Sequence, residues 1–309
     1  MLKRPVAAIL AAATLTATLL SGCGVNQLAA PQQQAGAFEA AGKKKAVATK
    51  FGLGANLKGA PKVKFDEGGE AEGMTIQAAL PAKVDLRGQC PPVYNQGPMG
   101  ACSGFAIAKG LGEFILKKQN RHVELSGLYL YYQERKMEGS INEDAGARIS
   151  DGMKVLDNLG CAPEKDHPYL PMSKWSDADA LKEYLTMKPG NDDVAAGKSY
   201  RIAGTQPINS LRAIRNSLAK GMPVVLGIAI FESFQSEAAA KTGVIPMPNV
   251  EKEEMMGGHA VVCVGYDNTK KVLIMRNSWG KEWGDKGYFY LPYGFIQQGL
   301  AADAWTAKI

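Results

Sequence analysis

Histidine is scarce in this chain, and long hydrophobic runs are too. Three histidines occur in 309 residues, and no two of them have metal-ligand spacing, so we expect neither a zinc site nor another cofactor. The net charge is only +6, and no lysine-arginine stripe interleaves with aromatic residues, which argues against a nucleic-acid partner. What remains, with 46% hydrophobic and 21% charged residues, is typical of a globular enzyme.

The N-terminus has the pattern of an export signal. Lys3 and Arg4 precede a single apolar run, residues 6–20, which is too short to form a stable membrane span. Leu20-Ser21-Gly22-Cys23 follows and resembles a bacterial lipobox. We therefore expect residues 1–22 to be a lipoprotein signal peptide and Cys23 to carry a lipid that anchors the chain to the membrane. The alternative is an ordinary cleaved signal with an incidental cysteine.

Residues 23–80 differ in composition from the rest of the chain. They are rich in Ala, Gly, Gln and Lys and have no sustained apolar periodicity, which predicts a flexible tether. The alternative is a short propeptide in which Phe51-Gly52-Leu53-Gly54 lies across a cleft as a latch. Residue 24, directly after Cys23, is glycine and not aspartate, which by the habit of bacterial lipoproteins favours the outer membrane. We expect an exported protein anchored in the cell envelope, at the outer membrane or facing the periplasm, or released from the cell.

A glycine-rich turn that leads into a helix carries one cysteine. Residues 95–105 read Asn-Gln-Gly-Pro-Met-Gly-Ala-Cys-Ser-Gly-Phe, and the apolar residues of 103–118 fall on one helical face. Cys102 is therefore expected at a helix N-terminus, where unpaired N–H groups and the helix dipole favour the nucleophilic thiolate. The alternative is a small buried hydrophobic residue, which is what most free cysteines are.

His259 is the histidine best placed to act as a base. His122 follows a polar stretch and His167 precedes a proline, so both read as loop or turn residues. His259 opens the β-branched run 260–266, which predicts a buried strand with the histidine facing a cleft. It could equally be a satisfied core histidine.

Asn277 is the candidate partner of that histidine. It follows a second predicted strand, residues 272–275, which would pair with the first as a hairpin. Its amide oxygen could accept the second ring N–H of His259, and Trp279 could shield the bond from water. The alternative is an Asn-Ser turn beside a core tryptophan.

Three blocks of sequence together resemble the papain-like cysteine peptidases. They are Gln96 with Gly100-Ala101-Cys102, then Gly258-His259-Ala260 with Val264-Gly265-Tyr266, then Asn277-Ser278-Trp279-Gly280 with Trp283-Gly284 and Gly287-Tyr288-Phe289. The resemblance is closest to bacterial xylellain-like members, which have a sequence pattern like that of residues 90–97. It covers about residues 81–309. It implies a two-lobed fold, with a helical left lobe, a β-barrel-like right lobe and the active-site cleft between them.

The distribution of predicted elements agrees with an α+β fold. Helices dominate the first half of the chain and strands the second. Besides those already described, the predicted elements are helices that begin at Ser126 and cover 151–158 and 209–220, and strands at 223–230 and 287–291.

The resemblance also implies a role for each site residue. Cys102 is expected to be the nucleophile, His259 the general base and Asn277 its orienting partner, while Gln96 and the Cys102 N–H stabilise the oxyanion. The cysteine and histidine are expected to rest as thiolate and imidazolium. The implied activity is endopeptidase cleavage of polypeptides by a monomer, through a thioester.

Five residues are expected to bind substrate by the same resemblance. Gly146 and Ala147, in the sequence Asp144-Ala145-Gly146-Ala147, resemble the wall along which substrate adds as a strand. The other three are Gly258, Ala260 and Trp279.

The chain departs from the family at two positions. Met99 stands three residues before the nucleophile, where relatives have a disulfide-bonded cysteine, and Ser103 replaces an aromatic residue, which we expect to alter the wall beside the thiolate. Two further cysteines, Cys90 and Cys161, could form a disulfide in an exported protein, and Cys263 reads as a core residue. Two other functions remain open: a catalytically inactive binding module, and acyl transfer to amines in place of water.

Overall fold

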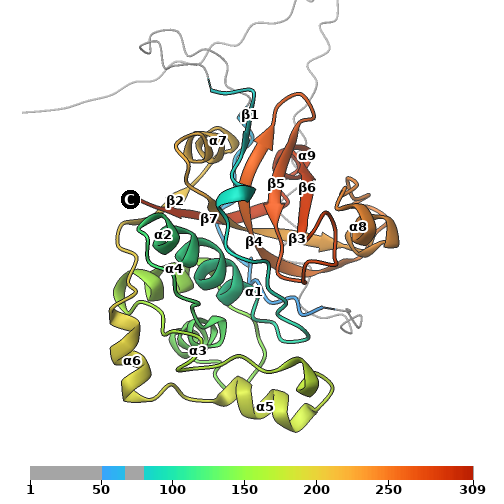
Figure 1. Ribbon diagram of the computed structural model, residues 1–309. Coiled ribbons are helices and arrows are strands. Elements are labelled where there is room, and N and C mark those ends of the chain that lie inside the picture. Colours follow the sequence, from blue (N-terminus) through green and yellow to red (C-terminus); the bar gives the residue numbers. More distant parts are fainter. Residues whose placement is uncertain (1–50, 67–79, 309) are drawn as a thin grey trace, which may run out of the picture. The chain divides into compact units, whose positions relative to one another are not determined.

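The computed structural model describes residues 51–66 and 80–308 (Figure 1). The predicted signal peptide and Cys23 lie outside the described residues. The chain has an α+β fold with a helical lobe and a lobe built on an antiparallel sheet, as predicted. Within the described ranges, no helix has both the length and the hydropathy needed to cross a bilayer.

The sheet forms the barrel-like lobe. In the part of the chain that is described, its seven strands run in the order β2-β7-β3-β4-β5-β6, with β1 paired to β4, and every neighbouring pair is antiparallel. The strands are β1 (Lys83–Asp85), β2 (Thr205–Ile208), β3 (Val224–Phe231), β4 (Met255–Asp267), β5 (Val272–Arg276), β6 (Tyr288–Pro292) and β7 (Ala301–Ala307). Because β3 is buried on both faces, its apolar run does not alternate with polar residues.

Helices α1 to α6 lie between β1 and β2 in the chain, whereas α7, α8 and α9 fall among the later strands, so helices do not dominate only the first half as predicted (Figure 1). The longer ones are α1 (Cys102–Gly104) continuing through the π-helical η3 (Phe105–Gly112) into α2 (Glu113–Lys118), then α3 (Gly127–Glu138), α4 (Ile149–Asn158), α5 (Ala178–Thr186), α6 (Asn191–Lys198) and α7 (Leu211–Ala219). Shorter ones are η2 (Arg87–Gln89), η4 (Met172–Lys174), η5 (Glu232–Gln235), α8 (Glu237–Thr242) and α9 (Gly294–Gln297).

The helix that begins at Cys102 lies between the two lobes. Its η3 segment contacts β3 and β4 on one side and α3 and α4 on the other. Gly110 permits the approach to the sheet, because a Cβ at this position would lie 2.5 Å from Cγ2 of Val262. The predicted helix over 103–118 is therefore present, and its N-terminal residue stands where the lobes meet.

Two other predicted helices are present; Ser126 caps the first as expected, and the second, predicted from Asn209, is capped by Ser210. The Ser126 hydroxyl accepts the N–H of Tyr129 at the start of α3, and the Ser210 hydroxyl accepts the N–H of Ala213 at the start of α7. The predicted hairpin is also present as β4 and β5. β4 begins at Met255, so His259 lies within the strand and does not open it.

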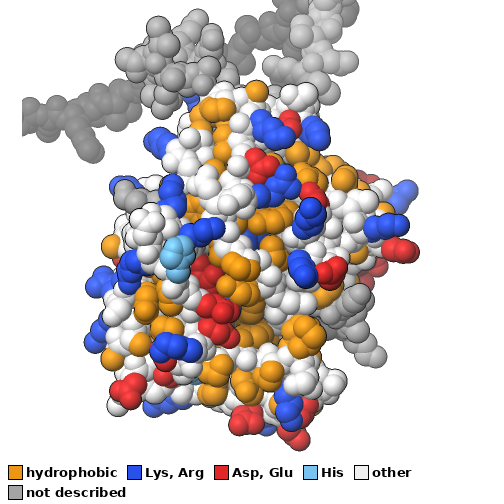
Figure 2. All heavy atoms as spheres, viewed as in Figure 1, with side chains coloured by type: hydrophobic (Ala, Val, Ile, Leu, Met, Phe, Trp, Pro, Cys, Tyr) orange, Lys and Arg blue, Asp and Glu red, His pale blue; other side chains and the backbone are white. Residues whose placement is uncertain are grey.

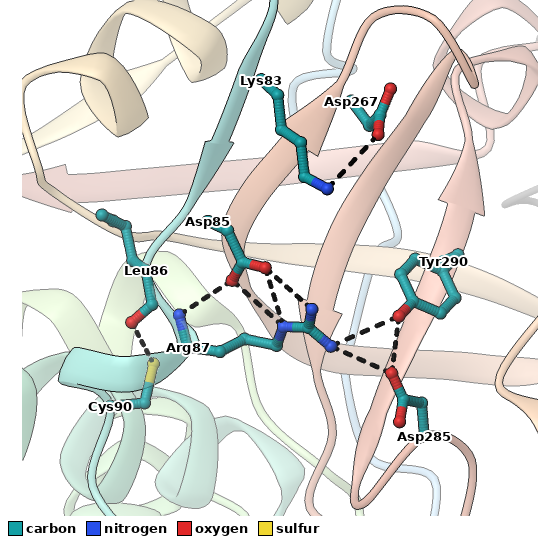
Figure 3. Close-up of polar contacts among 8 residues, drawn as sticks. All are labelled: Lys83, Asp85, Leu86, Arg87, Cys90, Asp267, Asp285 and Tyr290. Carbon is teal, nitrogen blue, oxygen red and sulfur yellow. Dashed lines mark hydrogen bonds and ion pairs between the residues drawn. The ribbon is translucent and has the colours of Figure 1, made fainter.

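Arg87 fastens the beginning of the domain to the sheet (Figure 3). Its guanidinium donates to the carboxylate of Asp85, with 2.8 Å between Nη2 and Oδ2, and to that of Asp285, with 2.9 Å between Nη1 and Oδ2. The same group reaches the hydroxyl of Tyr290 on β6. These contacts place residues 83–87 along the outside of the β4–β6 sheet.

The possible disulfide between Cys90 and Cys161 is not formed. Both residues are free thiols, as is Cys263, which is buried in the core as expected. Cys90 Sγ donates to the carbonyl oxygen of Leu86, which Figure 3 shows, and Cys161 Sγ donates to that of Ser126. Each thiol thus has its own main-chain acceptor.

Charged side chains of both signs are spread over the face of the molecule that Figure 2 shows, with hydrophobic side chains between them. This mixture agrees with the modest net charge of +6.

Candidate active site

His259 and Asn277 form the hydrogen bond that the sequence predicts. His259 Nε2 lies 2.8 Å from Asn277 Oδ1, and both side chains are buried. The two residues meet because β4 and β5 are neighbouring strands and Asn277 directly follows β5. The indole of Trp279 stacks on the imidazole with 4.7 Å between ring centroids, so it shields the bond from water as expected.

Cys102 is the first residue of α1, as predicted, and its side chain is fully buried. Its Sγ accepts the N–H of Ala260 at 3.3 Å and a second main-chain N–H from Gly54. The other ring nitrogen of His259, Nδ1, is buried and has no hydrogen-bond partner among the described residues. In this state the thiol is therefore held by main-chain donors, and the imidazole is not bonded to it.

Burial shifts both titrating groups toward their neutral forms. It raises the pKa of the Cys102 thiol to about 12 and lowers the pKa of the His259 imidazole to about 4. The expected thiolate–imidazolium pair is thus disfavoured here. The physical reason is that neither group can be solvated when it is charged.

Gln96 directs its side-chain NH₂ group at two carbonyl oxygens. Nε2 donates to the oxygen of Gly52 at 3.1 Å and to that of Met99 at 2.9 Å. The Ser278 hydroxyl donates to Gln96 Oε1 at 2.6 Å and so fixes which end of the amide faces the cleft. Ser278 belongs to the sequence block Asn277-Ser278-Trp279-Gly280, but the resemblance assigns no role to it.

Residues 51–66, which we call the strap, lie along the predicted substrate wall. Asn56 N donates to the oxygen of Ala147 at 2.9 Å, and Ala147 N donates to the oxygen of Gly54 at 2.7 Å. On the opposite side, Ala55 N donates to the oxygen of Gly258 at 3.0 Å. The strap thus takes main-chain bonds from both lobes, and it runs parallel to the chain at Ala147.

The strap can approach the nucleophile loop closely because glycines stand where the two main chains are nearest. A Cβ on Gly52 would lie 2.1 Å from the oxygen of Met99, and one on Gly54 would lie 1.7 Å from the oxygen of Gly100. The substrate wall approaches the strap just as closely, since a Cβ on Gly146 would lie 2.1 Å from the oxygen of Gly54. Side chains at these positions would force the two segments apart.

Larger side chains of the strap are seated on either side of the glycines. The Phe51 ring stacks on the Trp279 indole with 4.8 Å between centroids and 7° between planes. Leu57 is buried, and its Cδ2 occupies the space that a Cβ on Gly227 of β3 would take. All five predicted substrate-binding residues therefore contact either the strap or, in the case of Ala260, the Cys102 thiol.

The second half of the strap is attached to the barrel-like lobe. Val63 N donates to the oxygen of Ala301 on β7 at 3.0 Å, and Asp303 N donates to the oxygen of Pro61 at 2.9 Å. Lys64 N donates to the oxygen of Asn209 at 2.8 Å, just before α7. Residues 51–66 thus make main-chain hydrogen bonds to the domain along their length, and a latch at Phe51-Gly52-Leu53-Gly54 stays a prediction.

Ser103 does not line the cleft, contrary to our expectation. Its side chain is buried and its hydroxyl donates to Glu134 Oε2 on α3 at 2.6 Å. The helix turns this position toward the interior of the helical lobe. The departure from an aromatic residue thus changes the packing behind the nucleophile and leaves the cleft surface unaffected.

Comparison with known proteins decides the family. Residues 80–307 match the papain family cysteine proteases. The chain belongs to this family. A papain-family domain with this cleft is a cysteine peptidase, which is a hydrolase, as the resemblance implied.

Several papain-family proteins are similar in sequence. An uncharacterised peptidase C1-like protein of Acanthamoeba polyphaga mimivirus is 36% identical over 220 residues, which cover 69% of this chain and 68% of that protein. Cathepsin K of Mus musculus is 28% identical over 220 residues, which cover 70% of this chain and 60% of that protein. The chain thus spans roughly two thirds of the length of the curated relatives that it matches.

Solved papain-family structures agree with the fold. Xylellain, a cysteine protease from Xylella fastidiosa, is 34% identical with a TM-score of 0.69, and the match covers 86% of this chain and 99% of that one. Bromelain from Ananas comosus, in complex with the E64 inhibitor, has a TM-score of 0.56 at 24% identity, covering 74% of this chain and 100% of that one. The second likeness concerns the fold alone.

Proposed function

We propose that this papain-family protein is an endopeptidase that works through Cys102, His259 and Asn277, and that its strap keeps it inactive. The Cys102 sulfur attacks the peptide carbonyl carbon while His259 takes the thiol proton. The C–N bond then breaks, and His259 gives that proton to the leaving amine. Water, deprotonated by His259, hydrolyses the thioester and regenerates the thiol.

Asn277 supports the base in this scheme. Its bond to His259 Nε2 leaves Nδ1 as the nitrogen that can exchange protons with sulfur and substrate. Trp279 excludes water from the bond. Because the ring is then held in one orientation, its proton transfer requires no rotation.

The hydrogen bond from Gln96 to the Gly52 oxygen is the observation that carries the proposal. The main-chain oxygen of Gly52, in the strap, accepts from Gln96 Nε2 and so lies where we expect a substrate carbonyl oxygen to bind. A substrate carbonyl at this position would develop negative charge as sulfur adds to it, and a neutral NH₂ group stabilises that charge without protonating the thiolate.

The strap blocks the cleft without presenting a bond that the thiol can attack. It offers the Gly54 N–H to the Cys102 sulfur, whereas cleavage requires a carbonyl carbon at that place. Gly54 and Asn56 also use the main-chain groups of Ala147 that would bind a substrate strand. Inhibition therefore follows from occupancy of the cleft in an unproductive orientation.

We further propose that the chain is exported and carries a lipid on Cys23, an inference that rests on sequence alone. The basic residues, the short apolar run and the lipobox-like end support it. Labelling of cells with a fatty-acid analogue should modify the full chain but not a Cys23→Ser variant. Equal labelling of both proteins would exclude this site.

Peptide hydrolysis and active-site labelling test the catalytic proposal. The chain with its strap opened by Gly54→Ala, and the same protein with Cys102→Ala, are treated with an epoxide probe, with Cys90→Ser in that background as the control for loss of another free thiol. We expect labelling and turnover in the opened chain and in its Cys90→Ser variant, and neither in its Cys102→Ala variant. Turnover that survives Cys102→Ala would refute the proposal.

Two other outcomes of the same assay would point to the alternatives. Peptide binding without turnover or labelling, in every protein including one with an opened strap, indicates a binding module. Product analysis with an added amine tests acyl transfer, since a transferase would form the new amide in preference to the free acid. Hydrolysis as the main product supports the peptidase.

A further inference from the structure

The nucleophile and the substrate wall come from separate segments of the helical lobe. Cys102 follows the loop of residues 98–101, and the wall is formed by Gly146 and Ala147 before α4. A peptide bond is attacked only if the main chain bound at the wall is in register with the sulfur. Something must therefore hold these two segments at a fixed separation.

The Asp144 carboxylate binds the main chain of the nucleophile loop at Gly100. The N–H of Gly100 donates to both carboxylate oxygens, at 3.1 Å to Oδ1 and 2.9 Å to Oδ2. Asp144 itself lies at the surface, but Gly100 is buried, and a Cβ on Gly100 would lie 3.0 Å from Oδ1. A bond from an N–H to a charged acceptor is stronger than one between neutral groups.

Tyr131 joins that carboxylate to the wall. Its hydroxyl donates to Asp144 Oδ1 at 2.6 Å and accepts the N–H of Gly146 at 3.0 Å. The tyrosine is fully buried on α3, so its hydroxyl is held in place by the packed helix. One hydroxyl and one carboxylate thus connect Gly100 with Gly146.

We propose that Asp144 and Tyr131 are positioning residues that fix the nucleophile loop against the substrate wall. This inference rests on the proposed peptidase function. Gly100, the neighbour of Met99, is held by the Asp144 carboxylate. The chain ties this loop down without a covalent bond.

A shift of Gly100 would disturb the residues on either side of it. The oxygen of Met99 accepts from Gln96 Nε2, and the N–H of Cys102 is the second expected oxyanion donor. Movement of the loop would therefore change the distance between the two donors. Displacements on the order of 1 Å in such a site cost about 100-fold in rate.

The two residues should affect different kinetic constants. Asp144 acts on the loop that carries the sulfur, so Asp144→Ala should lower kcat about tenfold or more with a smaller change in KM. Tyr131 acts on the wall that binds substrate main chain, so Tyr131→Phe should mainly raise KM. Asp144→Asn keeps one oxygen for Gly100 and should recover much of the loss.

The experiment measures kcat, KM and amide hydrogen exchange in the full-length chain. All variants carry Gly54→Ala to open the strap, and Glu143→Gln is the control, because it removes an exposed carboxylate from the adjacent residue without touching this network. We expect Asp144→Ala to deprotect the Gly100 amide and Tyr131→Phe to deprotect the Gly146 amide, with the kinetic split given above.

Each other result overturns the inference. If Asp144→Ala and Asp144→Asn both match Glu143→Gln within about twofold in kcat and KM, or if Gly100 protection survives in Asp144→Ala, the residues do not position the site. If no protein turns over peptide at all, the proposed function fails. The hydrogen exchange of the Gly100 and Gly146 amides then tests independently whether Asp144 and Tyr131 hold these segments, and unchanged protection in the variants refutes it.

Discussion

The side-chain NH₂ group of Gln96 donates a hydrogen bond to the main-chain oxygen of Gly52, which belongs to the strap, at 3.1 Å. A donor suited to a substrate carbonyl is therefore already satisfied by the protein's own chain. In the proposed mechanism, the same NH₂ group binds the strap when the strap is in place and the substrate oxyanion when the strap is displaced. Substitutions on the two sides of this bond should have opposite effects on activity.

Gly54→Ala should activate the enzyme. The new Cβ would lie 1.7 Å from the oxygen of Gly100, so the strap can no longer approach the nucleophile loop. Overpacking of this kind costs about 1–3 kcal/mol in the closed state, which corresponds to a rise in the open fraction of roughly 5- to 150-fold. The measurement is the rate at which an epoxide probe labels Cys102.

Lys58→Ala is the control for this activation. Lys58 is exposed and lies in the same strap, so its loss should leave the labelling rate near that of the parent. Equal rates for the parent and for Gly54→Ala would mean that the strap does not limit access to the thiol.

Gln96→Ala should lower kcat by about 10²–10³ with little effect on KM, because the lost NH₂ group acts on charge that forms in the transition state. Ser278→Ala should have a smaller effect of the same kind, since the hydroxyl only orients Gln96 Oε1. Both are measured as steady-state kinetics in the Gly54→Ala background. A loss confined to KM would assign Gln96 to substrate binding.

The folded chain should lose stability as the pH falls from about 6.5 to about 4. Burial holds the pKa of His259 at about 4, whereas an unfolded histidine titrates near 6.5, so the unfolded state takes up a proton in this window. The contribution is fully present above pH 6.5 and is lost by pH 4, and it amounts to about 3 kcal/mol.

Urea unfolding of Cys102→Ala, with and without His259→Gln, isolates that contribution. The glutamine variant cannot take up the proton, so its stability should fall less steeply between pH 6.5 and 4. Parallel curves for the two proteins would show that His259 is not held neutral by burial.

Glu134→Gln should be tolerated and Glu134→Ala should not. Burial raises the pKa of Glu134 well above its ordinary value and so favours the neutral acid, whose Oε2 accepts from the Ser103 hydroxyl. Glutamine keeps that acceptor and should cost less than about 1 kcal/mol of unfolding free energy, whereas alanine leaves a cavity and an unpaired hydroxyl and should cost about 2–4. Urea unfolding checks both, and similar losses would contradict the neutral state.

The arrangement of the candidate site could be predicted from the sequence because local signals mark each part of it. The glycine turn before Cys102 predicts a helix start, and the β-branched run after His259 predicts a strand whose neighbour ends at Asn277. These three residues are brought together by one helix and one hairpin. Both elements have strong signals of period and composition.

Beyond the latch alternative for residues 51–54, the sequence does not predict the strap, and it does not predict the contact between Asp144 and Gly100. Residues 51–57 have no helical or strand period, because they are held by main-chain bonds to Ala147 and Gly258 that depend on no side chain. Asp144 acts on Gly100 through a backbone N–H, which has no sequence signature. β7 was missed for a related reason, since alanine-rich Ala301–Ala307 is a strand only by its pairing with β2 and β3.

If the strap inhibits as proposed, the attachment of residues 61–66 to β7 and to the start of α7 gives it a fixed effective concentration. When residues 51–57 leave the cleft, they remain tethered a few residues from it, so dilution of the protein does not favour release. A peptide added from outside must exceed that local concentration before it can displace them, commonly on the order of millimolar for short links. Substrates that bind weakly are therefore excluded by competition as well as by fit.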